Sequence, residues 1–403
     1  MLFRFLLAFF AFGLYNRTNN AHKGEFFMKI KRIGEPRVIM SNENSRHKYF
    51  AWPTARRLKN GRIAAVASGY RLSHICPFGK TVISYSENEG ETYTLPAAVI
   101  DTPLDDRDGG ILAFGESGVI VTSFNNTADM QRKHMHNRYN LAGEGEEAER
   151  KLMADFRNAY LDYLTPEEEE KYLAASFRVS FDNGVTFGPI YKSPITSPHG
   201  PLELKNGKII WIGRSFITER NFEAVEDKLS VYEINPENGE MTYIGEIEQI
   251  FDGEDKLLSC EPDTVELDDG TLICHIRAQG GQRRFFTIYQ SESYDGGKTW
   301  TKPHQLLERR GGAPSHILKL ADGTLVATYG YREEPAGIKA MISTDGAKTW
   351  ETGLDVYVNG VSFDIGYPST VELKDGSFIT VFYAHTEDGG PARIMQQHWA
   401  IEK

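Results

Sequence analysis

The chain has 403 residues and a formal net charge of −11, and its residues are 40% hydrophobic and 12% aromatic. This composition supplies enough apolar side chains for a large core. The acidic balance argues against nucleic acid and anionic membranes as partners, because both favour a basic protein surface. The three cysteines, Cys76, Cys260 and Cys274, form neither a disulfide framework nor a CxxC metal motif, so we expect no metal and no cofactor.

Residues 1–27 begin with the apolar run MLFRFLLAFFAFGLY, which is typical of a secretory signal peptide. The run is too short and interrupted for a membrane span, so we expect no stable membrane anchor. A second interpretation starts translation at Met28, because the codons for KGEFF can contain a bacterial ribosome-binding site. We favour this start, which predicts a cytoplasmic protein with reduced cysteines; a signal peptide would predict secretion. Residues 28–403 are then expected to form a single domain.

Two short phrases recur along the rest of the chain. The first is a hairpin signal, a strand and a tight turn followed by an apolar strand, with turn glycines at Gly61, Gly118, Gly207, Gly270, Gly323 and Gly376. The second is the Asp box, seen in SYDGGKTW (293–300) and STDGAKTW (343–350) and more weakly from Ser86, Ser180 and Asn235. Its Ser and Asp side chains can bond the backbone of a turn that Trp then anchors. This long period predicts an all-β, six-bladed β-propeller with four-stranded blades.

The two ends of the chain and one internal segment complete this prediction. We expect ARIMQQHWAI to be the third strand of the last blade, and MKIKRIGEPRVIM to add its fourth strand and close the ring. Residues 126–175 break the β pattern with helical periodicity, and Thr165 followed by Pro166 is a helix start signal. We therefore predict a helical insertion between the second and third strands of blade two.

Strand direction decides which end of the propeller carries function. The glycine turns and the Asp boxes share one face, so the starts of first strands and the ends of second strands share the other. The starts carry Trp52, Asp108, His199, Glu261, Pro314 and Tyr367, and the ends carry Arg71, Asn125, Arg214, Arg277, Arg332 and His385. This concentration of charged and aromatic side chains predicts a ligand site on that face.

The chain resembles the sialidase (neuraminidase) superfamily over residues 29–403. The Asp boxes are a hallmark of that family, CEPDTVELDDGTLICHIR is similar to its blade-four segment, and GYPSTVELKDG is similar to the segment of its tyrosine nucleophile. The resemblance implies that Tyr367 is the nucleophile, that Glu261 is its base and that Arg277 binds a substrate carboxylate. A neutral tyrosine suits such a substrate, because an anionic nucleophile would be repelled.

The sequence also departs from the family pattern. Ala51 stands in the place of the first family arginine, and EEPAGIKAMIS lacks the third, so part of the arginine triad is missing. Arg332 and Arg46 are candidates to replace them from nearby loops. The loop that carries the acid/base aspartate in the family offers His74 but no carboxylate, so His74 and Asp108 are the candidate general acids.

These observations predict a sialidase-like glycoside hydrolase, exo-acting on short oligosaccharides, with a substrate that differs from ordinary sialosides. The predicted catalytic residues are Tyr367, Glu261, His74 and Asp108, and the predicted substrate-binding residues are Arg277, Arg71, Trp52, His199, Arg214 and Arg332. Two alternatives stay open. One is a polysaccharide lyase acting on a uronate, with His74 or His199 as the base. The other is a glycan-binding propeller without catalysis. All three readings make a carbohydrate the partner.

Overall fold

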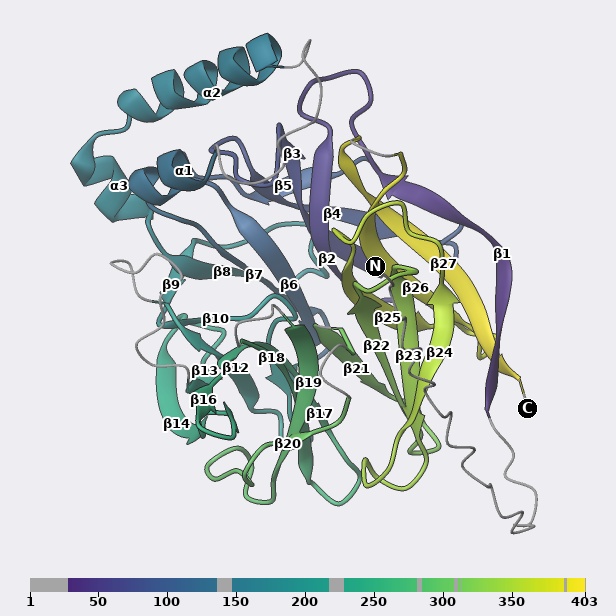
Figure 1. Ribbon diagram of the computed structural model, residues 1–403. Coiled ribbons are helices and arrows are strands. Elements are labelled where there is room, and N and C mark those ends of the chain that lie inside the picture. Colours follow the sequence, from purple (N-terminus) through teal and green to yellow (C-terminus); the bar gives the residue numbers. More distant parts are fainter. Residues whose placement is uncertain are drawn as a thin grey trace, which may run out of the picture.

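The computed structural model describes residues 28–135, 147–216, 228–280, 285–307, 311–312, 314–387 and 390–402. Our predictions for residues 1–27 lie outside these residues. The described residues form six antiparallel sheets arranged as the blades of a propeller, together with one small two-stranded sheet (Figure 1). The predicted all-β, six-bladed fold is therefore confirmed.

Blade one comprises β2 (Tyr49–Arg57), β3 (Ile63–Arg71), β4 (Lys80–Ser86) and β5 (Ala97–Ile100), and blade two comprises β6 (Arg107–Phe114), β7 (Gly118–Phe124), β8 (Ala175–Ser180) and β9 (Tyr191–Ser193). Blade three comprises β10 (Ile195–Thr196), β11 (Leu202–Glu203), β12 (Ile209–Ser215), β13 (Leu229–Ile234) and β14 (Met241–Ile247). Blade four comprises β17 (Leu258–Glu266), β18 (Leu272–Gly280), β19 (Phe285–Ser293) and β20 (His304–Gln305), after a small hairpin of β15 (Phe251–Asp252) and β16 (Asp255–Lys256). Blade five comprises β21 (Ser315–Lys319), β22 (Leu325–Tyr331), β23 (Gly337–Ser343) and β24 (Glu351–Tyr357). Blade six comprises β25 (Gly366–Glu372), β26 (Phe378–His385), β27 (Ala392–Glu402) and β1 (Lys29–Met40).

The last blade joins the two ends of the chain. Strand β1 pairs antiparallel with β27, so that Lys29 faces Glu402 and Met40 faces Ile394, and the two strands lie side by side in Figure 1. This pairing covers the outer edge of β27, whose backbone groups would otherwise template pairing with another chain. The predicted ring closure is confirmed.

The Asp boxes form the turns between the third and fourth strands. In the first complete box, Ser293 Oγ accepts a hydrogen bond from the Gly297 amide at 2.9 Å, and Asp295 accepts from the Thr299 amide at 2.9 Å and from its hydroxyl at 2.7 Å. In the second box Trp350 Nε1 donates to Gln290 Oε1 in blade four at 3.0 Å. These local bonds make each turn rigid without any partner from the opposite face.

The hydrophobic core is divided among the blade boundaries. Six apolar clusters are each shared by two neighbouring blades, and together they run round the whole ring. Trp211, for example, is fully buried between blades two and three, and Trp399 is fully buried between blades five and six. Burial of apolar surface at about 25 cal/mol per Å² makes these contacts the main stabilising term of the ring.

The predicted insertion consists of three helices between β7 and β8, which confirms its place in blade two. They are α1 (Ala128–Met135), α2 (Glu147–Asp162) and α3 (Pro166–Tyr172), and Figure 1 shows them gathered at one edge of the propeller. Thr165 caps α3 in a capping box with Glu168. On α2, Arg157 Nη1 donates to Ser73 Oγ at 2.5 Å and to the Ile75 carbonyl at 3.1 Å. The insertion therefore packs on the loop between β3 and β4.

Candidate active site

Four residues near the starts of the first, innermost strands of their blades share a strained backbone conformation. Trp52, Asp108, Glu261 and Tyr367 have φ angles of 53°, 48°, 50° and 51°. Each lies at an irregularity in strand pairing. A non-glycine residue at such an angle costs roughly 1–3 kcal/mol, and strain of this kind clusters at functional sites. In blade three the position before Pro201 is Gly200, which has no side chain to present.

Glu261 and Tyr367 form the centre of this arrangement, together with Arg277 from β18. Tyr367 Oη donates a hydrogen bond to Glu261 Oε1 at 2.5 Å. Arg277 Nη1 donates to Glu261 Oε2 at 2.5 Å and to Tyr367 Oη at 3.2 Å. Burial and the charge of Glu261 raise the pKa of the Tyr367 phenol well above its ordinary value. The resting phenol is thus protonated, and Glu261 is the base in position to remove its proton.

Arg332 reaches the same centre from the end of β22. Its Nε donates to the Ile365 carbonyl at 2.9 Å, and its Nη2 donates to Tyr383 Oη at 3.2 Å. The guanidinium carbon lies 5.1 Å from the centre of the Phe286 ring, and that of Arg277 lies 4.7 Å from the same ring. Phe286 thus places two arginines beside Tyr367, one from blade four and one from blade five.

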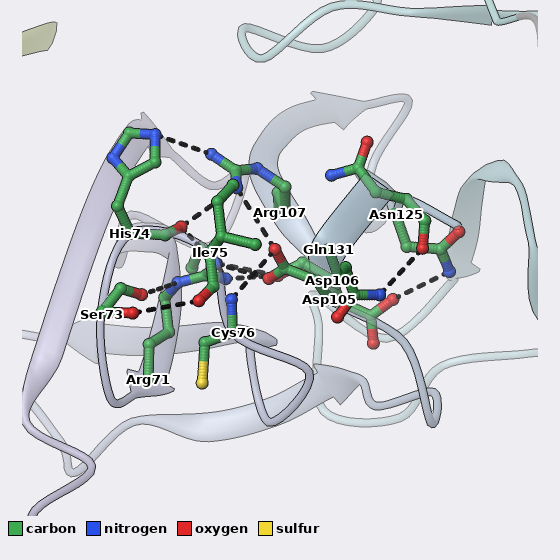
Figure 2. A network of polar contacts seen from close by, with 12 residues as sticks. Arg71, Ser73, His74, Ile75, Cys76, Asp105, Asp106, Arg107, Asn125 and Gln131 are labelled. Atoms are coloured by element: carbon green, nitrogen blue, oxygen red, sulfur yellow. Dashed lines mark hydrogen bonds and ion pairs between the residues drawn. The ribbon is translucent and has the colours of Figure 1, made fainter. Parts of the chain in front are cut away.

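Blades one and two contribute a buried ionic network (Figure 2). Asp105 forms ion pairs with Arg71 and, at 3.3 Å, with Arg107. Both arginines also donate to the His74 carbonyl, at 2.7 and 3.0 Å, and the Cys76 amide donates to Asp105 at 3.2 Å. The network therefore ties the loop after β3 to the start of β6, where Asp108 lies.

Replacing Asp105 with asparagine is expected to lower the free energy of unfolding by about 3 kcal/mol, because it leaves the buried Arg71 guanidinium without its paired anion and Arg107 with the more distant Asp108 at 3.9 Å. The matched control is Asp101→Asn, since Asp101 pairs with Lys80 at the surface, where the side chains are 49% and 34% exposed. That change should cost under about 1 kcal/mol. Urea unfolding with a constant m-value measures both. Equal losses in the two variants would contradict a special role for Asp105.

Trp52 and Asp108 line the side of the site next to this network. The Arg107 guanidinium lies 4.3 Å from the Trp52 ring centre, and that of Arg71 lies 5.1 Å away. Asp108 is buried, its Oδ1 accepts no hydrogen bond from the described residues, and Arg107 Nε lies 3.9 Å from it. Burial outweighs that cation and raises the pKa of Asp108 to about 6, with the charge of Glu261 adding to the rise. Asp108 is therefore a carboxyl group able to carry a proton near neutrality.

His74, the other candidate acid, has both ring nitrogens in contact with protein groups. Its Nε2 lies 3.4 Å from Arg107 Nη2, and its Nδ1 lies 3.4 Å from Tyr49 Oη. A guanidinium can only donate, so Nε2 accepts and Nδ1 carries the proton in this arrangement. A neutral imidazole with its proton on the Tyr49 side is poorly placed to donate to a substrate.

The other predicted substrate-binding residues lie in different surroundings. Arg71 is fully buried and all three of its guanidinium nitrogens bond protein groups. His199 is fully buried 6.0 Å from His316, measured between ring centres, and neither of its ring nitrogens has a hydrogen-bond partner among the described residues. Arg214 is half-buried near the end of β12. The structure brings Arg277, Arg332 and Trp52 to the Tyr367 centre; substrate contact by Arg71, His199 and Arg214 stays a prediction.

Sequence reasoning placed His385 on this face but missed Arg107, Asp364 and the two tyrosines that bond Asp364. Asp364 accepts hydrogen bonds from Tyr383 Oη at 2.7 Å and from Tyr49 Oη at 3.4 Å, and it pairs with His385 Nε2 at 3.0 Å. The run DDRDGG contained a signal for Arg107, because an arginine between aspartates can form ion pairs with them. Tyr49 and Tyr383 lie in apolar strand segments, where the sequence pattern predicts aromatic side chains of the core. Nothing in the sequence therefore indicates that they bond Asp364.

The described part of the chain lacks two kinds of feature. No group of three His, Cys, Asp or Glu side chains among those residues has a geometry that could bind a metal ion. None of the described helices is both long enough and apolar enough to cross a membrane.

Residues 174–380, more than half of the chain, match the family model described as a BNR repeat-like domain. The chain belongs to the BNR repeat-like domain family. This confirms the recognition of an Asp-box propeller. No curated protein matches this BNR repeat-like chain.

Solved structures extend the comparison of this BNR repeat-like chain to the whole fold. A protein of unknown function from Dyadobacter fermentans is 22% identical, with a TM-score of 0.69 over 93% of this chain and 99% of that chain. The NanB sialidase of Streptococcus pneumoniae is 12% identical, with a TM-score of 0.60 over 90% of this chain and 70% of that chain. The intramolecular trans-sialidase of Ruminococcus gnavus is 14% identical, with a TM-score of 0.57 over 89% and 95% of the two chains. The fold is thus sialidase-like.

Proposed function

We propose that this protein is a glycoside hydrolase in which Tyr367 attacks the anomeric carbon and Glu261 accepts the phenolic proton. The observation that carries the proposal is the bond from Tyr367 Oη to Glu261 Oε1, with Arg277 donating to both groups. A base bonded to a strained, buried phenol has no evident use in a protein that only binds glycans. The sialidase-like fold and the resemblance of both segments to the sialidase family support the same assignment.

In this mechanism the phenolate forms only as Tyr367 bonds to the sugar, because its raised pKa keeps it protonated beforehand. Glu261 takes the proton, and Arg277 stabilises the resulting charges through its two hydrogen bonds. Asp108 is the proposed general acid, which protonates the leaving oxygen and afterwards removes a proton from the attacking water. Its buried, unbonded Oδ1 supports this role better than the bonded ring of His74 does.

The proposed substrate carries an anionic group. Arg277 and Arg332 lie beside Tyr367 on one aromatic ring, and a planar guanidinium matches a carboxylate with parallel hydrogen bonds. Arg332 follows β22, whereas the missing third family arginine would stand in the later stretch EEPAGIKAMIS. Ala51, which stands in the place of the first family arginine, is fully buried. The carboxylate would therefore be approached from blades four and five, which supports a substrate that differs from ordinary sialosides.

The insertion bounds one side of the proposed site. Besides the Arg157 bonds, Phe156 of α2 stacks on Phe78 with ring centres 5.2 Å apart, and Tyr160 contacts the same ring at 4.8 Å. These contacts fix the loop that carries His74. A fixed wall on this side supports exo cleavage of short oligosaccharides rather than binding along a long chain.

The uronate lyase alternative has less support. It needs a histidine base at the substrate, but His199 is fully buried and both nitrogens of His74 face protein groups. Its product would contain a new carbon–carbon double bond conjugated to the carboxylate, which absorbs in the short-wavelength ultraviolet.

A panel of methylumbelliferyl glycosides tests the proposed function, with the α-sialoside and the glucuronide as acidic members and neutral sugars beside them. We expect fluorescence release from an acidic member, and release must disappear in Glu261→Gln. Oligouronates are assayed in parallel by ultraviolet absorbance. Release by no glycoside together with a rise in absorbance would overturn the proposal in favour of a lyase.

A further inference from the structure

A histidine–carboxylate pair lies behind the arginine side of the site. His385, at the end of β26, has Nε2 3.0 Å from Asp364 Oδ2 and Nδ1 2.5 Å from the Gly390 carbonyl. Carboxylate and carbonyl oxygens only accept hydrogen bonds, so both ring nitrogens must carry protons to satisfy both contacts. The geometry thus describes an imidazolium facing a carboxylate, with the His385 side chain only 10% exposed.

Asp364 is connected to Arg332 by hydrogen bonds through Tyr383. Its Oδ1 accepts from Tyr383 Oη at 2.7 Å, and Tyr383 Oη in turn accepts from Arg332 Nη2 at 3.2 Å. Arg332 is also fixed through its Nε to the Ile365 carbonyl, one residue after Asp364. The hydrogen bonds therefore run without a break from His385 to the guanidinium beside Tyr367.

Other titratable and charged groups face the pair from every neighbouring element. Arg393 of β27 acts on His385 but is itself paired with Glu43 at 2.6 Å. Tyr49 of β2 lies with its ring centre 6.3 Å from that of His385. Arg332 acts on Asp364 by charge, and His74 would do so if it were protonated. Burial lowers the pKa of His385, but Asp364 outweighs burial and Arg393, so the net shift is upward.

Since both nitrogens of His385 are bonded, the ring has no free position for acid or base chemistry on a substrate. We infer that His385 and Asp364 are positioning residues which, while His385 is protonated, fix Tyr383 and through it the substrate-facing guanidinium of Arg332. The substrate-facing part of this inference rests on the proposed function. The pair would thus set the affinity for an anionic sugar and leave the chemical step unchanged.

Deprotonation of His385 removes one of its two donated hydrogen bonds and the counter-charge of buried Asp364. Tyr383 and Arg332 then keep their hydrogen bonds to Asp364 and to the Ile365 carbonyl, but without the charge of His385 to fix Asp364. Because the pKa of His385 is raised, the pair is intact at low pH and is lost as the pH rises through a value above about 6.5, the ordinary histidine value.

NMR of the full chain tests the coupling without any substrate. The ring signal of His385, assigned by its loss in His385→Gln, is expected to titrate above pH 6.5. The Nε–H signal of Arg332, assigned by its loss in Arg332→Lys, is expected to shift with the same midpoint. A His385 midpoint below 6.5, or an Arg332 signal that ignores the His385 titration, would overturn the inference. If His385→Gln does not fold, the contact of the ring with Gly390 assigns the signal in the wild type.

Two further variants separate positioning from a general structural role. Tyr383→Phe removes the link but keeps the ion pair, so His385 should still titrate above 6.5 while Arg332 no longer follows. His304→Gln is the matched control, because His304 is half-exposed on β20, and it should change neither signal. If Arg332 follows His385 equally well in Tyr383→Phe, the coupling does not pass through Tyr383 and the inference fails.

Kinetics with whichever acidic methylumbelliferyl glycoside the wild type hydrolyses adds a readout that depends on the proposed function. At pH 6, His385→Gln should raise KM about tenfold, which corresponds to the loss of one charge-assisted hydrogen bond, with kcat within about twofold. A fall in kcat at unchanged KM would overturn the positioning role. Coupled NMR titrations without hydrolysis would support the positioning pair and count against the proposed function alone.

Discussion

Replacing Tyr367 with phenylalanine is expected to reduce kcat at least about a thousandfold, with little change in KM, on whichever acidic glycoside the wild type hydrolyses. The change removes one oxygen atom and keeps the ring that packs in the core between blades six and one. It also removes the hydrogen bond to Glu261 at 2.5 Å and thus the proposed nucleophile. Initial rates over a range of substrate concentrations measure the effect, with thermal unfolding to show that the fold is retained.

Tyr329→Phe is the matched control for Tyr367→Phe. Tyr329 is also a buried tyrosine on a propeller strand, but it lies in the core between blades four and five. Its substitution should leave kcat within about twofold. A Tyr367→Phe variant that keeps more than about a tenth of the wild-type kcat would contradict nucleophilic catalysis by Tyr367, because loss of a covalent nucleophile is not made good by binding.

The fold was predictable because its turns are local. Ser293, Asp295 and Thr299 make the hydrogen bonds of an Asp box within seven consecutive residues. Five of the six predicted turn glycines have positive φ, such as 88° at Gly270, which other residues rarely adopt. In blade two the glycine with positive φ is Gly115, at 52°, rather than Gly118. Signals of this kind are complete within a short window, so blade number, strand order and ring closure follow from their repetition.

The backbone of the site was not predictable in the same way. Trp52, Glu261 and Tyr367 each precede a proline, which ordinarily favours an extended conformation rather than a positive φ. The surrounding ring imposes the strained angle, and nothing within each segment indicates it. In blade three the same position is Gly200, so our placement of His199 at the start of that strand was one residue early.

The direction of the Arg107 side chain was also not predictable from the sequence. Arg107 and Asp108 are adjacent, and a regular strand would direct their side chains to opposite faces. The irregularity between Arg107 and Gly110 removes that alternation, so Arg107 Nε lies 3.9 Å from Asp108 Oδ1. Contacts such as Tyr49 to Asp364 join residues 315 apart in the chain, which only the closed ring brings together.

The groups around each buried carboxyl group bear on the role proposed for it. Glu261 and Asp364 are each bonded to a cation or to several donors, so they are stabilised as anions. Among the described residues, Asp108 has one ion pair, at 3.9 Å, and its Oδ1 accepts no hydrogen bond. The carboxyl groups of Glu261 and Asp108 thus have different surroundings, and this difference supports the proposed roles of Glu261 as base and Asp108 as acid.

Asp108→Asn is expected to lower kcat/KM about 100- to 10,000-fold on a glycoside with an alkyl leaving group, the usual contribution of general acid catalysis. The loss should be smaller on a methylumbelliferyl glycoside, whose leaving oxygen needs less protonation. In the wild type the acid must be protonated, and burial raises its pKa to about 6. The value of kcat/KM should therefore fall about tenfold per pH unit above pH 6, and the variant should lack this limb.

Asp106→Asn is the control for this pH profile. Burial raises the pKa of Asp106 to about 7, but its oxygens accept hydrogen bonds from Thr102 and Asn125 and face the network rather than the site. The pKa of Asp106 lies in the same range as that of Asp108. If Asp108 causes the fall in kcat/KM above pH 6, the Asp106→Asn variant must still show that fall. Disappearance of the limb in Asp106→Asn, or equal losses on alkyl and aryl glycosides in Asp108→Asn, would rule out Asp108 as the acid. His74 would then be the remaining candidate, and its protonation would require the ring to leave the contact with Arg107.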